Sequence, residues 1–150
     1  MASKLTVMIV EDNLMLADLL EEILISYGHR VCGIARTVDA AIQLGRETQP
    51  DLAIIDVRLA DHGFGPDVAE ALADQTGTAV LYATGNLDIA ILLDARGQGC
   101  LVKPYRVEDL VRSLEVVEEL HRLGRASGPI PRGFHFLSNR PNAIIDYPHG

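Results

Sequence analysis

The sequence contains few residues that could hold a soft metal ion. Its two cysteines, Cys32 and Cys100, lie in separate strand-like segments without CxxC spacing, and its five histidines are scattered along the chain. Structural zinc sites use closely spaced Cys and His ligands, so this composition does not indicate one. We therefore expect both thiols to be free and inert.

Long hydrophobic runs are also missing. Hydrophobic residues make up 48% of the 150-residue chain, yet no apolar stretch approaches the roughly 20 residues of a membrane-spanning helix. The N-terminal segment MASKLTVMIVED reaches two acids too soon to be a secretory signal. These features predict a globular protein of the cytoplasm.

Positive charge is scarce. The chain has 13 Lys and Arg residues against 21 Asp and Glu residues, which gives a formal net charge of −8. This balance disfavours contact with nucleic-acid phosphates and with membrane surfaces. We expect no direct DNA binding and no membrane association, and partners that are proteins or metal ions.

Strand-like and helix-like segments alternate five times along the chain. The apolar strand-like runs are nearly continuous, whereas the helical segments are amphipathic, which is typical of a parallel sheet covered on both faces. The predicted fold is α/β, a doubly wound five-stranded parallel sheet of the (βα)5 flavodoxin-like type. Strands are expected at Leu5–Val10, Arg30–Ala35, a segment ending at Asp56, Thr78–Ala83 and Gly99–Val102, and helices at Leu14–Tyr27, Val38–Glu47, Pro66–Asp74, Leu87–Ala95 and Val107–Leu123.

The character of the chain changes after residue 123. Residues 124–150 contain four prolines and four glycines and have no helical period. We expect residues 1–123 to form one domain and residues 124–150 to be an irregular or partly disordered extension without a domain of its own. This extension is too short for a DNA-binding domain and is predicted to be dispensable for the site described next.

Polar side chains follow four of the five predicted strands. Because the carboxyl ends of parallel strands meet at one edge of a sheet, these side chains should converge there. Singly, each is better explained as a helix cap or a turn residue, but five suitable residues at four strand ends are hard to attribute to chance. They are Glu11 and Asp12 after the first strand, Asp56 after the third, Thr84 after the fourth and Lys103 after the fifth.

The residue types at this edge point to a particular chemistry. Carboxylate oxygens without Cys or His ligands favour Mg²⁺. A metal, a lysine and a hydroxyl can neutralise the equatorial oxygens of a phosphoryl group while an aspartate oxygen attacks in line. The sequence therefore predicts a phosphoryl-transfer site.

Four motifs at these positions carry a resemblance to a known family. They are VEDN after the first strand, IIDVRL around Asp56, ATG at Thr84 and KP at Lys103. Over residues 4–123 the chain resembles the CheY-like receiver domain of bacterial two-component response regulators. The resemblance implies that Asp56 accepts a phosphoryl group from a sensor histidine kinase or a phosphotransfer protein, and that the protein is a phosphoacceptor in a phosphorelay rather than an enzyme, with self-catalysed phosphorylation and dephosphorylation at most.

The resemblance also assigns roles to the neighbouring residues. It implies that Asp12 binds Mg²⁺ directly, that Glu11 binds it largely through water, and that Asp56 and the Arg58 carbonyl complete the protein ligands. Thr84 would hydrogen-bond the phosphoryl group, Lys103 would pair with it, and the peptide bond before Pro104 would be cis.

Two departures from the family pattern concern the output. The aromatic switch residue usual three positions before the lysine is Cys100 here, and Thr84 and Lys103 are only 19 positions apart. Both features resemble single-domain receivers that carry a Phe-Ala-Thr-Gly type motif. We therefore expect a stand-alone response regulator whose signal does not pass through a ring at Cys100, with Tyr82 and Tyr105 as the nearby aromatics that could respond instead.

Other readings remain open at this point. An Asp-nucleophile phosphatase of the haloacid dehalogenase type shares Asp, Thr, Lys and Mg²⁺, but it expects an aspartate where this chain has Arg58, and its nucleophile ends the first strand. A receiver-shaped binding module that is never phosphorylated is a second alternative. The downstream protein partner is unknown, and the helix at Val107–Leu123 is a candidate surface for a homodimer.

Overall fold

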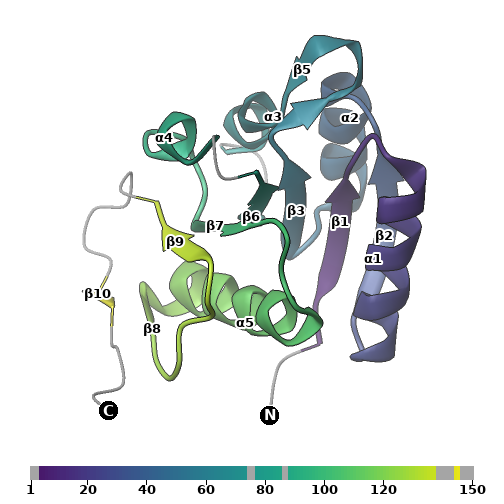
Figure 1. The fold of residues 1–150 in the computed structure, drawn as a ribbon. Helices are drawn as coiled ribbons and strands as arrows, with labels where there is room; N and C mark the ends of the chain where they lie inside the picture. Colours follow the sequence, from purple (N-terminus) through teal and green to yellow (C-terminus); the bar gives the residue numbers. More distant parts are fainter. Residues whose placement is uncertain (1–3, 74–76, 86–87, 138–143, 146–150) are drawn as a thin grey trace.

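The computed structural model describes residues 4–73, 77–85, 88–137 and 144–145. Its centre is a sheet in which five parallel strands run in the order β2-β1-β3-β6-β7 (Figure 1). The prediction of a doubly wound α/β fold with five parallel strands is confirmed. The strands are β1 (Thr6–Val10), β2 (Arg30–Ala35), β3 (Leu52–Asp56), β6 (Ala79–Thr84) and β7 (Gly99–Val102).

Helices cover both faces of the sheet. α1 (Leu14–Ser26) and α5 (Val107–Leu123) pack on one face, and α2 (Val38–Thr48), α3 (Gly65–Leu72) and α4 (Ile89–Leu92) lie on the other (Figure 1). Among the described residues, no helix has the length and hydrophobicity needed to cross a bilayer.

Local capping explains where the long helices begin and end. The side chain of Asn13 accepts the Leu16 N–H, and the hydroxyl of Thr37 accepts the Ala40 N–H, so each satisfies a backbone donor in the first turn of its helix. Gly124 ends α5 with a φ of 76°, a left-handed conformation that favours glycine. Position 87, where the fourth helix was expected to begin, and Asp74, where the third was expected to end, lie outside the described residues.

The segment between β3 and α3 forms regular structure of its own. β4 (Arg58–Leu59) and β5 (Gly63–Phe64) form a short antiparallel hairpin around a 3₁₀ turn, η1 (Ala60–His62). This hairpin leads directly into α3. It was not predicted, because two-residue strands leave no periodic signal in the sequence.

The C-terminal segment adds a sixth strand to the sheet. β9 (Phe134–Phe136) pairs antiparallel with the outer edge of β7, so the prediction of an irregular tail is wrong for these residues. A Cβ at Gly99 would lie 2.3 Å from Cζ of Phe134, which shows how closely that ring covers the strand. β8 (Arg125–Ala126) pairs in parallel with β10 (Ile144–Ile145).

One arginine of α5 fastens the start of this segment. Arg112 donates from Nε to the Pro129 carbonyl at 2.9 Å and from Nη2 to the Ser127 carbonyl. The Ser127 N–H in turn donates to Glu119 of the same helix. The segment after α5 is therefore held against that helix before it reaches the edge of the sheet.

Candidate functional site

Three carboxylates converge at the carboxyl edge of the sheet. Glu11 and Asp12 directly follow β1, and Asp56 is the last residue of β3, the strand that pairs with β1. One oxygen from each side chain lies within 4.8 Å of the others. Backbone pairing fixes this arrangement, because the Glu11 N–H also donates to the Ala35 carbonyl at the end of β2. The cluster offers only oxygen ligands, which suits a hard divalent cation.

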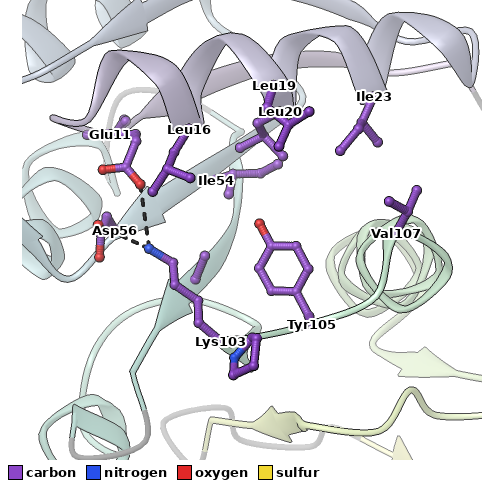
Figure 2. A pocket seen from close by; sticks show the side chains of 13 residues that line it. Glu11, Leu16, Leu19, Leu20, Ile23, Ile54, Asp56, Lys103, Tyr105 and Val107 are labelled. Carbon is purple, nitrogen blue, oxygen red and sulfur yellow. Dashed lines mark hydrogen bonds and ion pairs between the residues drawn. The ribbon is translucent and has the colours of Figure 1, made fainter.

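Lys103 reaches into this cluster from the end of β7. Its Nζ donates to Oδ2 of Asp56 at 3.3 Å and to Oε1 of Glu11 at 3.5 Å (Figure 2). Its backbone N–H donates to the Thr84 carbonyl at 2.7 Å, which anchors the strand end. The Lys103–Pro104 peptide bond is cis, as the family resemblance implies.

The electrostatics of the cluster follow from burial and crowding. Burial is the main cause that raises the pKa of Glu11 to about 7; the Asn13 N–H opposes it and the charge of Asp56 adds to it. Burial alone would lower the pKa of Lys103, but the carboxylates of Asp56 and Glu11 outweigh it and the net change is upward. Lys103 is therefore charged at neutral pH, and the three acids still outnumber it.

Gly65 packs closely against the backbone at the end of β3. Its N–H donates to the Val57 carbonyl at 2.7 Å, and a Cβ at this position would lie 2.1 Å from the Asp56 carbonyl oxygen. Only glycine permits so close an approach. Sequence reasoning missed this residue, and the only available signal was a glycine that directly precedes the predicted third helix.

The Thr84 hydroxyl is hydrogen-bonded away from the acidic cluster. Its side chain is fully buried at the end of β6, and its Oγ1 is 3.2 Å from both Oδ2 of Asp88 and the Gly85 carbonyl oxygen. Over the described ranges, no hydrogen bond joins the Thr84 hydroxyl to Asp56 or to the Lys103 side chain. The structure thus brings together Glu11, Asp12, Asp56 and Lys103 and leaves the Thr84 hydroxyl turned elsewhere.

The side chain of Arg58 also points away from the acids. Its Nη2 pairs with Oδ1 of Asp88 at 3.2 Å. Asp88 was not among the residues expected at the site, because an acid in a short loop gives no signal of its partners. The Arg58 carbonyl, expected as a metal ligand, belongs to the residue two positions after Asp56, and that role stays a prediction.

An apolar pocket opens next to the ion pair of Lys103. It has a volume of about 340 Å³ and lies between α1 and the segment after β7, with Leu16, Leu19, Ile23, Tyr105 and Val107 in its wall (Figure 2). Leu16 and Leu19 remain half exposed, and Met15 beside them is 83% exposed. A helical face of this kind is usually buried against a core or a partner.

The position of the usual aromatic switch is tightly packed. Cys100 is fully buried and lies opposite Tyr82 of β6 and His135 of β9. Both cysteines are free thiols, and burial raises the pKa of Cys100 to about 11, so this thiol is protonated and unreactive at neutral pH. Tyr82 is also fully buried, and its hydroxyl donates to the Arg96 carbonyl at 2.5 Å.

Comparison with known proteins agrees with this geometry. Residues 7–115 match the family model described as the response regulator receiver domain. The chain is 29% identical over 113 residues to the transcriptional regulatory protein PdtaR of Mycobacterium tuberculosis, covering 73% of this chain and 55% of that protein. It is 33% identical over 79 residues to the phyllosphere-induced regulator PhyR of Methylorubrum extorquens, covering 52% of this chain and 30% of that protein.

A solved structure extends the likeness to three dimensions. The signal receiver domain of a modulated diguanylate cyclase from Desulfovibrio desulfuricans superposes with a TM-score of 0.70 at 27% identity, covering 81% of this chain and 98% of that one. This chain belongs to the response regulator receiver domain family. It spans about half, or less, of the length of the two curated relatives, so their whole activities do not transfer to it directly.

Proposed function

We propose that this protein is a stand-alone response regulator in which Asp56 accepts a phosphoryl group with the help of Mg²⁺. The observation that carries the proposal is the meeting of three carboxylates within 4.8 Å, with the Lys103 Nζ 3.3 Å from Asp56. With all three acids ionised, the site carries a formal charge of about −2, which a divalent cation would balance; the cation would also favour the ionised form of Glu11, whose pKa burial raises to about 7.

The donor set fits Mg²⁺, which neutralises charge on phosphoryl oxygens when bound. Glu11, Asp12, Asp56 and the Arg58 carbonyl would hold the ion. An Asp56 oxygen forms the new O–P bond while the bond between phosphorus and the donor atom breaks, and the donor leaves with the bonding electron pair. Lys103 then exchanges its Asp56 contact for a phosphoryl oxygen, and the Thr84 hydroxyl donates to another.

The phosphodonor we propose is a sensor histidine kinase or a phosphotransfer protein of the cytoplasm. A protein donor must place its phosphohistidine over Asp56, so it must contact the surface beside it. The half-exposed Leu16 and Leu19 line the pocket that Asp56 also lines, which makes this face of α1 continuous with the site, and the exposed Met15 precedes Leu16 on the same helix. Docking there would bury apolar surface at the moment of transfer.

The signal leaves by contact with a downstream protein, or with a second copy of this chain, rather than with DNA. The net charge of −8 supports this choice because phosphates would repel it. An Asp-nucleophile phosphatase is less well supported, since Arg58 stands where its acid–base aspartate should be and directs its guanidinium to Asp88.

Intact-mass measurement tests the proposal. The wild-type chain, Asp56→Asn and Asp61→Asn are incubated with acetyl phosphate, with Mg²⁺ or with a chelator. We expect one phosphoryl group on wild type and on Asp61→Asn, an exposed acid in the neighbouring hairpin, and none on Asp56→Asn or without the metal. Equal modification of Asp56→Asn, or indifference to chelation, would refute the site; no modification of wild type would favour the unphosphorylated binding module.

A further inference from the structure

Asp88 joins the two loops that flank the acceptor aspartate. Its Oδ2 lies 3.2 Å from the Thr84 hydroxyl oxygen, and its Oδ1 lies 3.2 Å from Nη2 of Arg58. Thr84 ends β6, and Arg58 begins the hairpin just after Asp56. A single carboxylate therefore connects the hydroxyl that would hold the phosphoryl group to the segment that would help to hold the metal.

The Thr84 hydroxyl can donate to only one acceptor at a time because it has one proton. The Asp88 carboxylate competes for it with the Gly85 carbonyl at the same distance, and an ionised acceptor forms the stronger hydrogen bond. The Thr84 side chain has no exposed surface and that of Asp88 is only 19% exposed, so water competes weakly for this bond.

Arg58 keeps the Asp88 carboxylate in place. Its guanidinium is largely exposed, so the ion pair adds little stability by itself. It does orient the carboxylate, because one oxygen is directed to Arg58 while the other is left to face Thr84.

We propose that Asp88 is a positioning residue that holds the Thr84 hydroxyl away from Asp56 in the unmodified protein and releases it to the phosphoryl group. This inference rests on the proposed function of Asp56. The phosphoryl oxygens and the Asp88 carboxylate compete for the same proton, so loss of Asp88 favours the state in which Thr84 contacts the phosphoryl group. Asp88 thereby sets how strongly the site binds that group.

Binding of beryllofluoride, a phosphoryl mimic, with Mg²⁺ tests this inference, with the bound fluorine signal followed by ¹⁹F NMR. We expect Asp88→Ala to bind the mimic about three- to tenfold more tightly than wild type, since a competing charged hydrogen bond is lost. Asp88→Asn, which keeps a weaker neutral acceptor, should fall between them. Glu70→Gln, which removes a carboxylate from the exposed ion pair with Arg96, should match wild type.

The Thr84→Val background separates positioning from charge. If Asp88 acts through the hydroxyl, Asp88→Ala should change affinity less than about twofold once that hydroxyl is gone. If Asp88→Ala raises the affinity for the mimic equally in the wild-type and Thr84→Val backgrounds, the loss of negative charge alone explains the effect and the inference is wrong. An Asp88→Ala chain that binds the mimic no more tightly than wild type would also overturn the inference. If Asp88→Ala does not fold, Asp88→Asn takes its place, and an Asp88→Asn chain that binds the mimic no more tightly than wild type would overturn the inference. A wild-type chain that does not bind the mimic would refute the proposed function instead.

Discussion

Replacing Phe134 should destabilise the whole domain, although this residue lies in the segment after the last helix. Its ring is 8% exposed, belongs to the core cluster under α1 and α5, and meets Phe136 edge-on with ring centroids 5.0 Å apart. Phe→Ala substitutions in cores cost about 3–5 kcal/mol. Because β9 is the last strand in the order of the described sheet, we expect about 3 kcal/mol for Phe134→Ala, at the low end of that range, and less for Phe136→Ala, whose side chain is only partly buried.

Gly99 provides the matching half of this test. Its missing Cβ would meet the Phe134 ring at 2.3 Å, and overpacking of this kind costs about 1–3 kcal/mol. Gly99→Ala should therefore be costly in wild type and cost less than about 0.5 kcal/mol in Phe134→Ala, where the ring has gone.

Urea unfolding followed by circular dichroism measures all four chains of this cycle. A loss below about 1 kcal/mol for Phe134→Ala would show that β9 is not part of the core. A Gly99→Ala cost that is unchanged by removal of the ring would refute the contact. Removal of residues 124–150 should cost at least as much stability as Phe134→Ala, whereas the sequence predicted only that the tail is dispensable for the acidic site.

Three further substitutions test the site and its support. Burial lowers the pKa of His29, although the charge of Glu115 opposes this, and the Nδ1 atom of His29 accepts the Leu5 N–H at 3.1 Å. Because the folded pKa lies below the unfolded value of 6.5, the contribution of neutral His29 to stability is fully present above pH 6.5. This contribution is lost as the pH falls through the folded pKa. His29→Gln should flatten the fall in stability below about pH 6.5, and a urea midpoint that still falls as in wild type would contradict this. Gly65→Ala should lower the melting temperature and slow phosphorylation from acetyl phosphate, because the added Cβ would clash with the Asp56 carbonyl oxygen. Gly77→Ala is the control and should do neither, because a Cβ at Gly77 has open space around it. Equal behaviour of the two variants would show that Gly65 does not support the site. Tyr82→Phe should lower the free energy of unfolding by about 1–2 kcal/mol, because the Arg96 carbonyl loses the hydrogen bond from the Tyr82 hydroxyl. The phosphorylation rate should be unchanged, and a changed rate would show that Tyr82 takes part in the response to phosphorylation.

The parallel sheet and the acidic cluster could be predicted from sequence because both depend on local patterns. Apolar runs such as the one ending at Asp56 are buried on both faces, and topology alone then places the residues after each strand at one edge. No contact between distant side chains had to be guessed. The three carboxylates and Lys103 follow from this reasoning.

Contacts made by short or irregular segments could not be predicted in this way. β9 is three residues long and lies among prolines and glycines, so its pairing with β7 depends on tertiary packing rather than on a periodic pattern. The best signal was Gly99 itself, since a glycine inside a strand often marks the close approach of another group. The link from Asp88 to Thr84 depends on loop geometry, which residue types do not specify.

The pairing of β7 with β9 leaves one edge of the sheet unpaired while the chain is being synthesised. Phe134 follows Val102 by 32 positions, so the five parallel strands are all synthesised well before the strand that covers their outer edge. During that interval the backbone groups of Gly99–Val102 on the uncovered side are free to pair with another nascent chain. Premature termination or proteolysis before Phe134 would make this exposed edge permanent, and the resulting fragments would be prone to aggregate through it even when the acidic cluster of Glu11, Asp12 and Asp56 is intact.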